Sequence, residues 1–312
     1  MSSTPLMSLG LRAMSAAYAA MQTTGHNISN ANVEGYSRQE VELATAKGQY
    51  TGAGFFGKGV DVKTVSRAHD EFLTRAAATA KSLSSMDQAR QERLGQLQKV
   101  FPTGEGGIGY SMSQFLNSMV DLASRPGDSS TRQVVLARSQ DLATRFNSAA
   151  GQLDELQAGV TADLRTSVDT VNGITASLAK VNQQIAAVKG LGQPPNDLLD
   201  ERDTLISQLS GYIQVTTVNA DDGTVGVFAA GGQKLVLGGE SAQLNVTLDT
   251  DDPSRSALAL VDNGNQSALD YNTLGGGSIA GLLRFQNEDL VDRKSTRLNS
   301  SHEWISRMPS SA

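Results

Sequence analysis

The sequence predicts a mainly α fold, in which long helices form a rod or bundle and one small antiparallel β unit is inserted. Apolar residues recur at steps of three and four over several long stretches, the spacing of an amphipathic helix. Residues 213–260 are rich in short strand-like runs separated by Gly and Asp. Aromatic residues make up only 5% of the 312 residues, so the core must pack mainly through Ala, Leu, Val and Ile, which suits long helices.

The first helix is predicted at residues 5–24, where apolar side chains follow the three–four spacing of a coiled-coil seam. Most seam residues are small, and a helix of about 20 residues with such a stripe is marginal alone in water. We therefore expect a partner helix, and a surface helix on a globular core is the alternative. The seam consists of Leu6, Leu9, Ala13, Ala16, Ala20 and Thr23.

Extended chain is predicted between the first two helical regions. Residues 25–39 are rich in Gly, Asn and Ser, which indicates a turn or loop. Residues 39–43 and 60–65 alternate polar and apolar side chains like strands, on either side of the glycine-rich segment 52–59. We expect a hairpin or an extended connector here.

Three further helical segments are predicted from residue 68 onward. The first spans residues 68–101 and ends at Pro102, and the second spans residues 109–124 and ends before Pro126. The longest carries its apolar stripe over residues 142–188, which corresponds to about 70 Å at 1.5 Å per residue. A helix of that length is typical of a rod-like bundle.

Local signals bear on where the longest helix begins and bends. Ser130 lies three residues before Gln133, the spacing of a capping box. Gly159 and Gly173 lie inside the helix, and each costs about 1 kcal/mol relative to Ala. A bend or break is therefore allowed at either glycine.

A shorter helix leads to the β-rich region and is capped by Asn196 or Asp197. Gly and Asp turns separate the strand-like runs that follow, and residues 262–270 read as a loop. A last helix begins near Ser278. The predicted strands cover residues 215–218, 225–228, 234–237, 244–248 and 257–260.

The end of the chain differs in character from the rest. Residues 294–312 hold the only Trp and no helical stripe, and they resemble translated vector or adapter sequence. We expect this tail to be non-native, and a genuine disordered C-terminus is the alternative. The predicted division is 1–35 (first helix and turn), 36–66 (connector), 67–211 (helical rod domain), 212–275 (β-rich domain), 276–293 (a returning helix, cut short) and 294–312 (tail).

Charge and composition exclude several classes of partner. The net charge is −6 and no stretch gathers Lys and Arg on one face, so we expect no nucleic-acid partner. The absence of Cys excludes disulfides and thiol catalysis. No window approaches the roughly 18 apolar residues of a membrane span, and the N-terminus lacks a signal-peptide pattern. We expect no membrane partner, and either a cytoplasmic protein or export by a route that uses no such signal.

One glycine-rich segment matches two nucleotide-binding templates. Gly52, Gly54 and Gly57 have the G-x-G-x-x-G spacing, and Gly57 with Lys58 completes a P-loop pattern. Both templates need a strand before the glycines and a helix after them, and the P-loop needs Ser or Thr where Gly59 stands. A strand-like run follows instead. We interpret the segment as a flexible turn.

No arrangement of residues predicts metal or acid–base chemistry. His26, His69 and His302 have no metal-ligand neighbour at a useful spacing. The carboxylates at 249–252 lack the register of a calcium loop. Those at 197–203 favour a helix dipole, and nothing implies a cleft beside them. We therefore expect no cofactor, no metal and no enzymatic activity.

A family resemblance begins in the N-terminal region. Two stretches, Asn27-Ile28-Ser29-Asn30-Ala31-Asn32 and Gly35-Tyr36-Ser37-Arg38-Gln39, resemble the signature of flagellar rod, hook and hook-associated proteins. Over residues 1–293 the chain resembles the FlgK-type family of hook-associated proteins. The matching places are Gly57 with Gly59-Val60, Thr131-Arg132-Gln133-Val134-Val135, and Pro195-Asn196-Asp197-Leu198-Leu199-Asp200 with Arg202-Asp203.

The resemblance implies a structural subunit that joins hook to filament in the bacterial flagellum. Such a subunit is exported by the flagellar type III apparatus, lies outside the cell and polymerises through axial coiled-coil helices. Its implied partners are other copies of itself in a ring or tube, the hook protein and the next hook-associated protein. The family chain is longer, and its C-terminal helices complete the inner coil and the outer bundle. An export chaperone is implied only if that C-terminal region is present.

The roles that follow from the resemblance are mechanical. The seam residues Leu6, Leu9, Ala13, Ala16 and Ala20 are expected to form the axial assembly interface. The signature Asn residues and Gly35 are expected to hold the turn, because Asn and Gly tolerate left-handed backbone. Tyr36 is expected to anchor the loop against a neighbour. The alternatives are a coiled-coil adaptor or secreted rod-like interaction protein without a flagellar role, and an enzyme.

Overall fold

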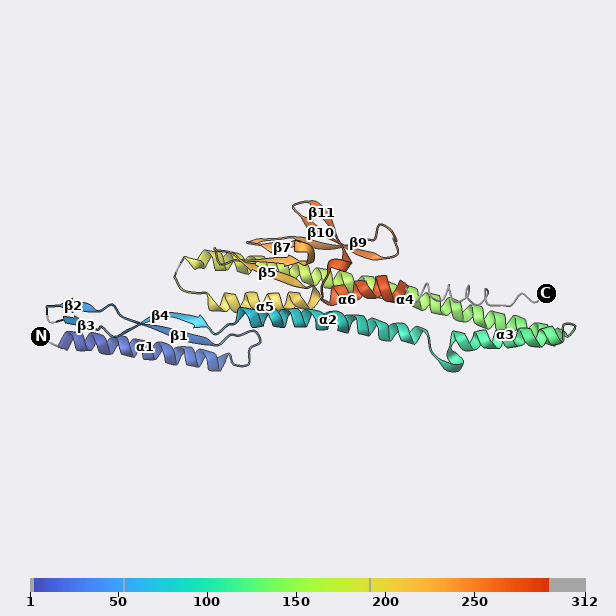
Figure 1. Cartoon of the computed structure of the whole chain (residues 1–312), viewed down its shortest axis with the longest axis horizontal. Helices are drawn as coiled ribbons and strands as arrows, with labels where there is room; N and C mark the ends of the chain where they lie inside the picture. Colours follow the sequence, from blue (N-terminus) through green and yellow to red (C-terminus); the bar gives the residue numbers. More distant parts are fainter. Residues whose placement is uncertain (1–2, 53, 191, 292–312) are drawn as a thin grey trace. The chain divides into compact units, whose positions relative to one another are not determined.

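The computed structural model describes residues 3–52, 54–190 and 192–291 (Figure 1). It confirms the predicted class: the chain is mainly α, with one helix far longer than the others and small antiparallel sheets. The chain forms two compact units. Unit 1 comprises Met1–Lys81 and Asn172–Gln243, and unit 2 comprises Ser82–Val171 and Leu244–Ala312. The predicted β-rich region therefore contributes strands to both units.

Unit 1 begins with a helix that lies along a β-hairpin (Figure 1). Strands β1 and β4 pair antiparallel, with Val41 opposite Val65, and the short hairpin β2–β3 lies in the connection between them. The elements are α1 (Ser3–Ser29), β1 (Gln39–Thr45), β2 (Gln49–Thr51), β3 (Gly54–Phe56) and β4 (Val60–Arg67).

The rest of unit 1 combines helices with a sheet in the order β5-β6-β7-β8. The fully buried Asn182 fastens this sheet to helix α4: its Nδ2 donates to the Val225 carbonyl at 2.9 Å, and its Oδ1 accepts from the Val225 N–H at 3.2 Å. The elements are the first turns of α2 (Glu71–Val100), the end of α4 (Ser129–Lys189), α5 (Asn196–Tyr212), β5 (Val215–Asn219), β6 (Val225–Ala229), β7 (Lys234–Leu237) and β8 (Glu240–Ser241).

Unit 2 contains the remaining parts of α2 and α4 and a second sheet in the order β11-β10-β9. The buried Gln286 side chain accepts from the Ser256 N–H at 3.0 Å and donates to its carbonyl at 2.9 Å, so it extends the ladder like a strand residue. The elements are α3 (Ile108–Ser124), β9 (Gln243–Leu248), β10 (Ser256–Asp262), β11 (Asn265–Leu269), α6 (Ser278–Arg284) and a π-helical turn (Phe285–Asp289).

Helix α4 differs from its prediction in two ways. It begins at Ser129, and the Asp128 carboxylate accepts the Ser130 N–H at 2.9 Å, so Asp128 and not Ser130 supplies the capping group. It also continues without a break through Gly159 and Gly173. The apolar residues on either side of these glycines are buried, and this burial outweighs about 1 kcal/mol per glycine.

Two other predictions were wrong in extent. The predicted loop at residues 262–270 instead contains a hairpin, with a tight turn at Asn263 (φ 49°) and Gly264 (φ 82°) between β10 and β11. Helix α1 continues five residues beyond the predicted end, through Ser29. The predicted tail at 294–312 lies outside the described residues. Among the residues that are described, no helix is both long enough and apolar enough to cross a membrane.

Candidate functional site

One face of α1 is packed against the hairpin β1–β4 by small side chains. Ala16 is only 4% exposed. Leu9 lies over Gly59, where an added Cβ would stand 2.8 Å from the Leu9 side chain and the backbone is left-handed (φ +88°). Arg12 forms an ion pair with Asp61 of β4. Small residues on the helix and a glycine on the hairpin thus allow a close approach.

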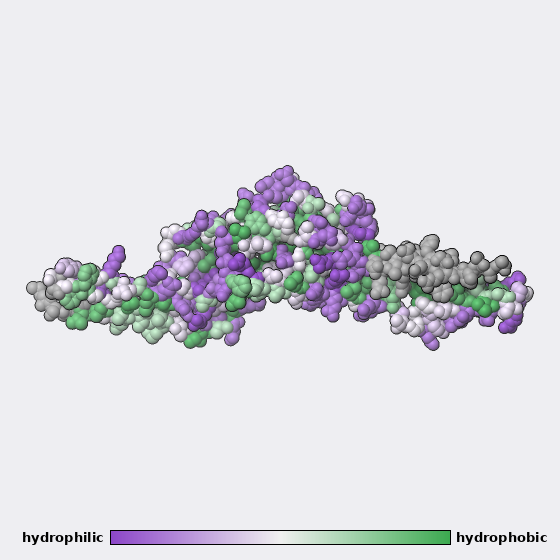
Figure 2. Space-filling model, in the orientation of Figure 1, coloured by the Kyte–Doolittle hydropathy of each residue, from purple (hydrophilic) through white to green (hydrophobic). Residues whose placement is uncertain are grey.

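The opposite face of α1 carries large apolar side chains that are mostly exposed in the described chain. They recur at steps of four and three, which is the heptad spacing of a coiled coil. Each is between 63% and 71% exposed. Figure 2 shows hydrophobic residues gathered along the surface that α1 occupies in Figure 1. This outer stripe consists of Met7, Leu11, Met14, Tyr18, Met21 and Ile28.

The seam predicted from the sequence is rotated around α1 relative to this outer stripe. Ala16 belongs to the face that packs on the hairpin. Leu9 contacts Gly59 of the hairpin and is also partly exposed to solvent. Leu6, Ala13 and Ala20 are exposed and flank the outer stripe. With 3.6 residues per turn, two stripes of the same spacing fit on one helix, and periodicity alone does not tell which one packs internally.

Asn27 organises the signature turn through three hydrogen bonds. Its Oδ1 accepts from the Tyr36 hydroxyl at 2.7 Å and from the Gln39 N–H at 2.8 Å, and its Nδ2 donates to the Gln39 carbonyl at 2.9 Å. The Tyr36 hydroxyl also lies 3.1 Å from His26 Nδ1. Tyr36 therefore anchors the turn to its own helix, and its predicted contact with a neighbour stays a prediction.

The remaining signature residues act differently from one another. Ile28 and Ser29 complete the last turn of α1, whereas Ala31 and Asn32 are exposed in the turn. Asn30 donates through Nδ2 to the His26 carbonyl at 3.0 Å. The expectation of left-handed backbone was wrong for the Asn residues and holds only for Gly35 (φ +84°). Asn27 and Asn30 instead stabilise the turn through hydrogen bonds between their side chains and backbone groups.

Helix α5 holds the signature turn from the other side. A Cβ at Gly35 would overlap the Thr204 hydroxyl of α5, so only glycine fits there. The Ser37 N–H donates to the Asp200 carboxylate at 3.0 Å. The Asn196 Nδ2 donates to the Val65 carbonyl of β4 at 2.8 Å. These contacts lock the turn, the hairpin and α5 into one structure within unit 1.

A nearly buried ion cluster lies at the centre of this junction. Arg67, whose side chain is 7% exposed, donates to Asp200 at 2.6 Å and to Asp203 at 2.9 Å. Burial raises the pKa of Tyr36, and the negative charges of Asp200 and Asp197 raise it further. The neutral phenol is thereby favoured as the donor to Asn27.

Sequence reasoning missed the Arg67 cluster. It assigned the acidic residues 197–203 to the helix dipole alone, although Asp200 and Asp203 share one face of α5 at three-residue spacing. That spacing, together with an Arg at the end of a strand, was the available signal. A cleft of about 490 Å³, which nothing in the sequence implied, is lined by Asp203 and His69.

The other sequence candidates do not converge on a reacting centre. Gly54 belongs to β3, and Gly57 and Lys58 lead into strand β4 and not into a helix. Asp249 accepts the N–H groups of Asp251 and Asp252 in a turn. Within the described residues, no group of three His, Cys, Asp or Glu side chains could hold a metal ion. His302 lies outside them.

Two protein families match this chain. A family described as "Flagellar hook-associated protein FlgK helical domain" matches residues 94–300, and "Flagella basal body rod protein" matches residues 7–36. The first match thus extends into the segment that the sequence analysis set apart as a tail.

Individual relatives are similar over most of this chain. Flagellar hook-associated protein 1 of Escherichia coli (strain K12) is 32% identical over 294 residues, 93% of this chain and 54% of that protein. The Bacillus subtilis (strain 168) protein of that name is 32% identical over 81% of this chain and 49% of its own length. The chain therefore spans about half the length of these relatives.

A solved structure is similar in fold as well as in sequence. It is the flagellar hook junction protein FlgK from Burkholderia pseudomallei, with a TM-score of 0.61 and 30% identity. The similarity covers 69% of this chain and 38% of that one.

Proposed function

The chain belongs to the FlgK family of flagellar hook-associated proteins, and we propose that it is a structural subunit that joins the flagellar hook to the filament. The outer stripe of α1 carries this proposal. A helix that packs its small residues internally and turns large ones outward in heptad spacing is suited to assembly with another helix.

The free energy available from the outer stripe is large enough for assembly. Fully burying one Leu or Met side chain contributes about 1.5–3 kcal/mol. Six such residues provide on the order of 10 kcal/mol before the entropy of association is subtracted. Leu6, Ala13 and Ala20 flank the stripe and widen the interface. The axial assembly interface thus comprises the outer stripe and these flanking positions.

The partners of this subunit follow from the family assignment. They are other copies of the same chain, the hook protein and the next hook-associated protein in the axial structure. The helix that covers the outer stripe comes from the C-terminal part of the family chain or from a neighbouring subunit. An export chaperone binds only where that C-terminal part is present. The subunit leaves the cell through the flagellar type III apparatus and acts mechanically, without catalysis.

Charge reversal on the outer stripe tests the proposal. In the full-length family protein, Met14→Asp with Met21→Asp is expected to abolish swimming in soft agar while the subunit is still exported into the medium, because a buried carboxylate prevents helix pairing. Ser177→Asp with Gln184→Asp is the matched control: it adds the same two charges, also seven residues apart, at exposed positions of α4, and swimming is expected to persist.

Electron microscopy of labelled subunits separates the outcomes. The stripe variant should be absent from hook ends, whereas the α4 control variant should be present. If the stripe variant occupies hook ends as the parent does, α1 does not form the assembly interface. If the parent itself never binds hook ends, the adaptor alternative is the correct reading.

A further inference from the structure

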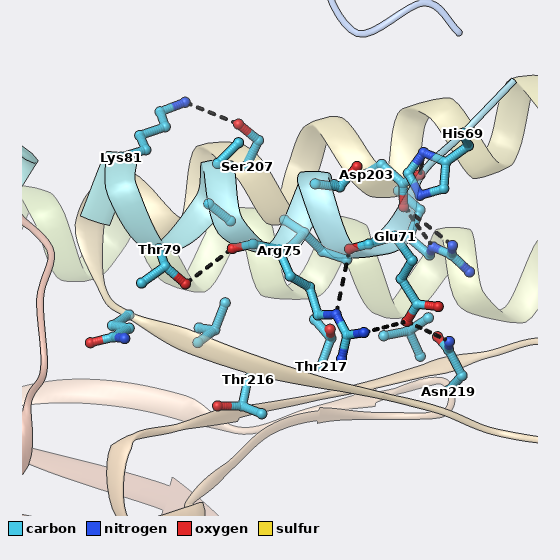
Figure 3. Close-up of a pocket in the computed structure, with 18 residues that line it drawn as sticks. His69, Glu71, Arg75, Thr79, Lys81, Asp203, Ser207, Thr216, Thr217 and Asn219 are labelled. Carbon is cyan, nitrogen blue, oxygen red and sulfur yellow. Dashed lines mark hydrogen bonds and ion pairs between the residues drawn. The ribbon is translucent and has the colours of Figure 1, made fainter. Parts of the chain in front are cut away.

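A cleft in unit 1 runs beside the sheet that contains strand β5 (Figure 3). Its volume is about 490 Å³, which lies within the roughly 300–1,000 Å³ of typical ligand pockets. Helices α2 and α5 form two of its walls and β5 forms the third. Apolar side chains, including Ala77, Ala78 and Ile206, line part of it.

Strand β5 meets this cleft with its edge. Successive side chains of a strand point to opposite faces of the sheet, so a cavity against one face is lined by every second residue. Here the consecutive residues Gln214, Val215, Thr216 and Thr217 all line the cleft. A cavity lined by both sets of residues must reach around the edge of the strand, and this one also reaches Val225 of β6 on one face. β5 is indeed the outermost strand in the order β5-β6-β7-β8.

The backbone groups on this edge can be assigned from the register. The pair that follows the end of the β5–β6 ladder is Ala220 with Thr224, and the Ala220 N–H donates to the Thr224 carbonyl at 2.9 Å. Hydrogen-bonded and non-hydrogen-bonded pairs alternate in an antiparallel ladder. Val215, Thr217 and Asn219 therefore direct their N–H and C=O groups away from β6 and toward the cleft.

The pairing on the other side of β6 agrees with this assignment. The Ala229 N–H donates to the Gln233 carbonyl at 2.8 Å, so Ala229 does not bond its β5 partner Val215. In the described residues, no hydrogen bond reaches the outward backbone groups of β5 from the cleft side.

Strand β5 itself lacks the features that usually blunt an edge. Exposed edges are usually blunted by Pro, Lys, a bulge or shortness. β5 has five residues of the sequence Val-Thr-Thr-Val-Asn and an unbroken register with β6. The opposite edge of the same sheet, β8, is only two residues long and carries Glu240. β5 is therefore the edge at which this sheet can be extended.

The charged side chains at the two ends of the cleft have different hydrogen-bond and ion-pair partners (Figure 3). At the Asn219 end, Glu71 accepts a hydrogen bond from the Asn219 side chain at 3.0 Å and faces Arg75 at 4.0 Å. At the other end, Lys81 donates to the Ser207 hydroxyl at 3.2 Å and pairs with no carboxylate of the described chain. A carboxylate near Lys81 would complete the lining.

We propose that β5 accepts an extended peptide segment of a partner protein as a fifth strand, with an acidic side chain directed to Lys81. A row of alternating N–H and C=O groups is matched by another backbone, which is the basis of strand addition in peptide recognition. The apolar lining then receives the alternate side chains of the segment. This site is separate from α1 and does not depend on the proposed junction role.

N-methylated peptides test the backbone pairing without changing the protein. The probe is a fluorescein-labelled Val-Thr-Val-Thr-Glu peptide, titrated with the 312-residue chain and followed by fluorescence anisotropy. Two isomers carry N-methyl groups on either the odd or the even residues. One isomer should bind at least about tenfold more weakly than the parent, since it loses hydrogen bonds worth about 1 kcal/mol each, and the other should bind nearly as well.

Two variants of the chain test whether the peptide binds at β5 and Lys81. Thr217→Pro removes one N–H that faces the cleft and no β5–β6 bond, so the peptide should bind about fivefold more weakly with the far-UV spectrum unchanged. Lys81→Gln should weaken binding roughly threefold, by loss of one partly exposed ion pair. The control Lys180→Gln, an exposed Lys of unit 1 outside the cleft, should leave binding unchanged.

Three outcomes would overturn the proposal. The first is the absence of saturable binding. The second is equal affinity of both N-methylated isomers, which would mean that backbone pairing does not hold the peptide. The third is a chain that dimerises in sedimentation experiments and becomes monomeric with Thr217→Pro, because the edge would then belong to a second copy and not to a partner protein.

Discussion

Helix α1 and the second half of helix α4 differ in the burial of their apolar residues. In α4, Leu164, Val171 and Leu178 are fully buried. In α1, Ala16 is the one described apolar residue that is buried, while Met14 and the other members of the outer stripe face solvent. Both helices have three–four periodicity. Periodicity therefore identifies the face of a helix that packs against another element. Only the burial of that face shows whether the other element belongs to this chain.

Truncating one residue on each helix should give the largest contrast. Leu178→Ala is expected to lower the free energy of unfolding by about 3 kcal/mol, because it leaves a cavity in a filled core. Met14→Ala should change it by less than about 0.5 kcal/mol. Urea denaturation followed by far-UV circular dichroism measures both. Equal losses would mean that α1 is already packed in solution.

Removing the central cation of the signature junction should have an effect of similar size. Arg67→Ala leaves the nearly buried Asp200 without its cation, while Asp203 keeps only Arg202 and His69, which costs about 3 kcal/mol of unfolding free energy. The matched control is Arg38→Ala, whose ion pair with Glu40 is largely exposed and is worth about 0–1 kcal/mol. If both variants unfold at the same urea concentration, the cluster does not stabilise the junction.

Two Gly→Ala substitutions should have opposite signs. Gly35→Ala is expected to destabilise the chain by about 1–3 kcal/mol, because the backbone there is left-handed and Thr204 occupies the space of the new Cβ. Gly10→Ala lies in the exposed part of α1 with open space around it and should stabilise by about 0.5–1 kcal/mol. Thermal unfolding measures both shifts. A loss of stability in the Gly10 variant would contradict the open surface described for α1.

Tyr36→Phe should give the smallest effect. At neutral pH it removes the hydroxyl that donates to Asn27, at a cost of about 1 kcal/mol. The folded-state pKa of Tyr36 is raised above its usual value of 10.0. Its contribution is therefore fully present below pH 10 and is lost as the pH rises through the folded-state pKa. The parent should lose part of its advantage over the Phe variant above pH 10, and parallel stability curves there would exclude this linkage.

The helices and most strands were predictable because local patterns specify them. The runs at 215–218, 225–228 and 234–237 all became strands, and helix α3 begins one residue from its predicted start. Strand β11 was missed since its sequence, Asn-Gln-Ser-Ala-Leu, is polar and carries little strand preference of its own. Its pairing with β10 across the Asn263-Gly264 turn decides its structure.

The signature turn was located from sequence, but its mechanism was not. Asn and Gly were expected to act through left-handed backbone, and only Gly35 does so. Asn27 acts through side-chain bonds to Gln39, which lies on the far side of the turn. The Arg67 cluster joins residues more than one hundred positions apart. No local window contains such a pair.

Periodicity and composition were sufficient to establish the mainly α class, the order of the elements and the resemblance of the signature, because each depends on neighbours within about ten residues of the chain. The tertiary structure alone decided which stripe of α1 packs on the hairpin, that the strands of the β-rich region divide between two sheets, and that β5 is an edge strand. These features depend on contacts between residues distant in sequence, where burial and hydrogen bonding outweigh local preference.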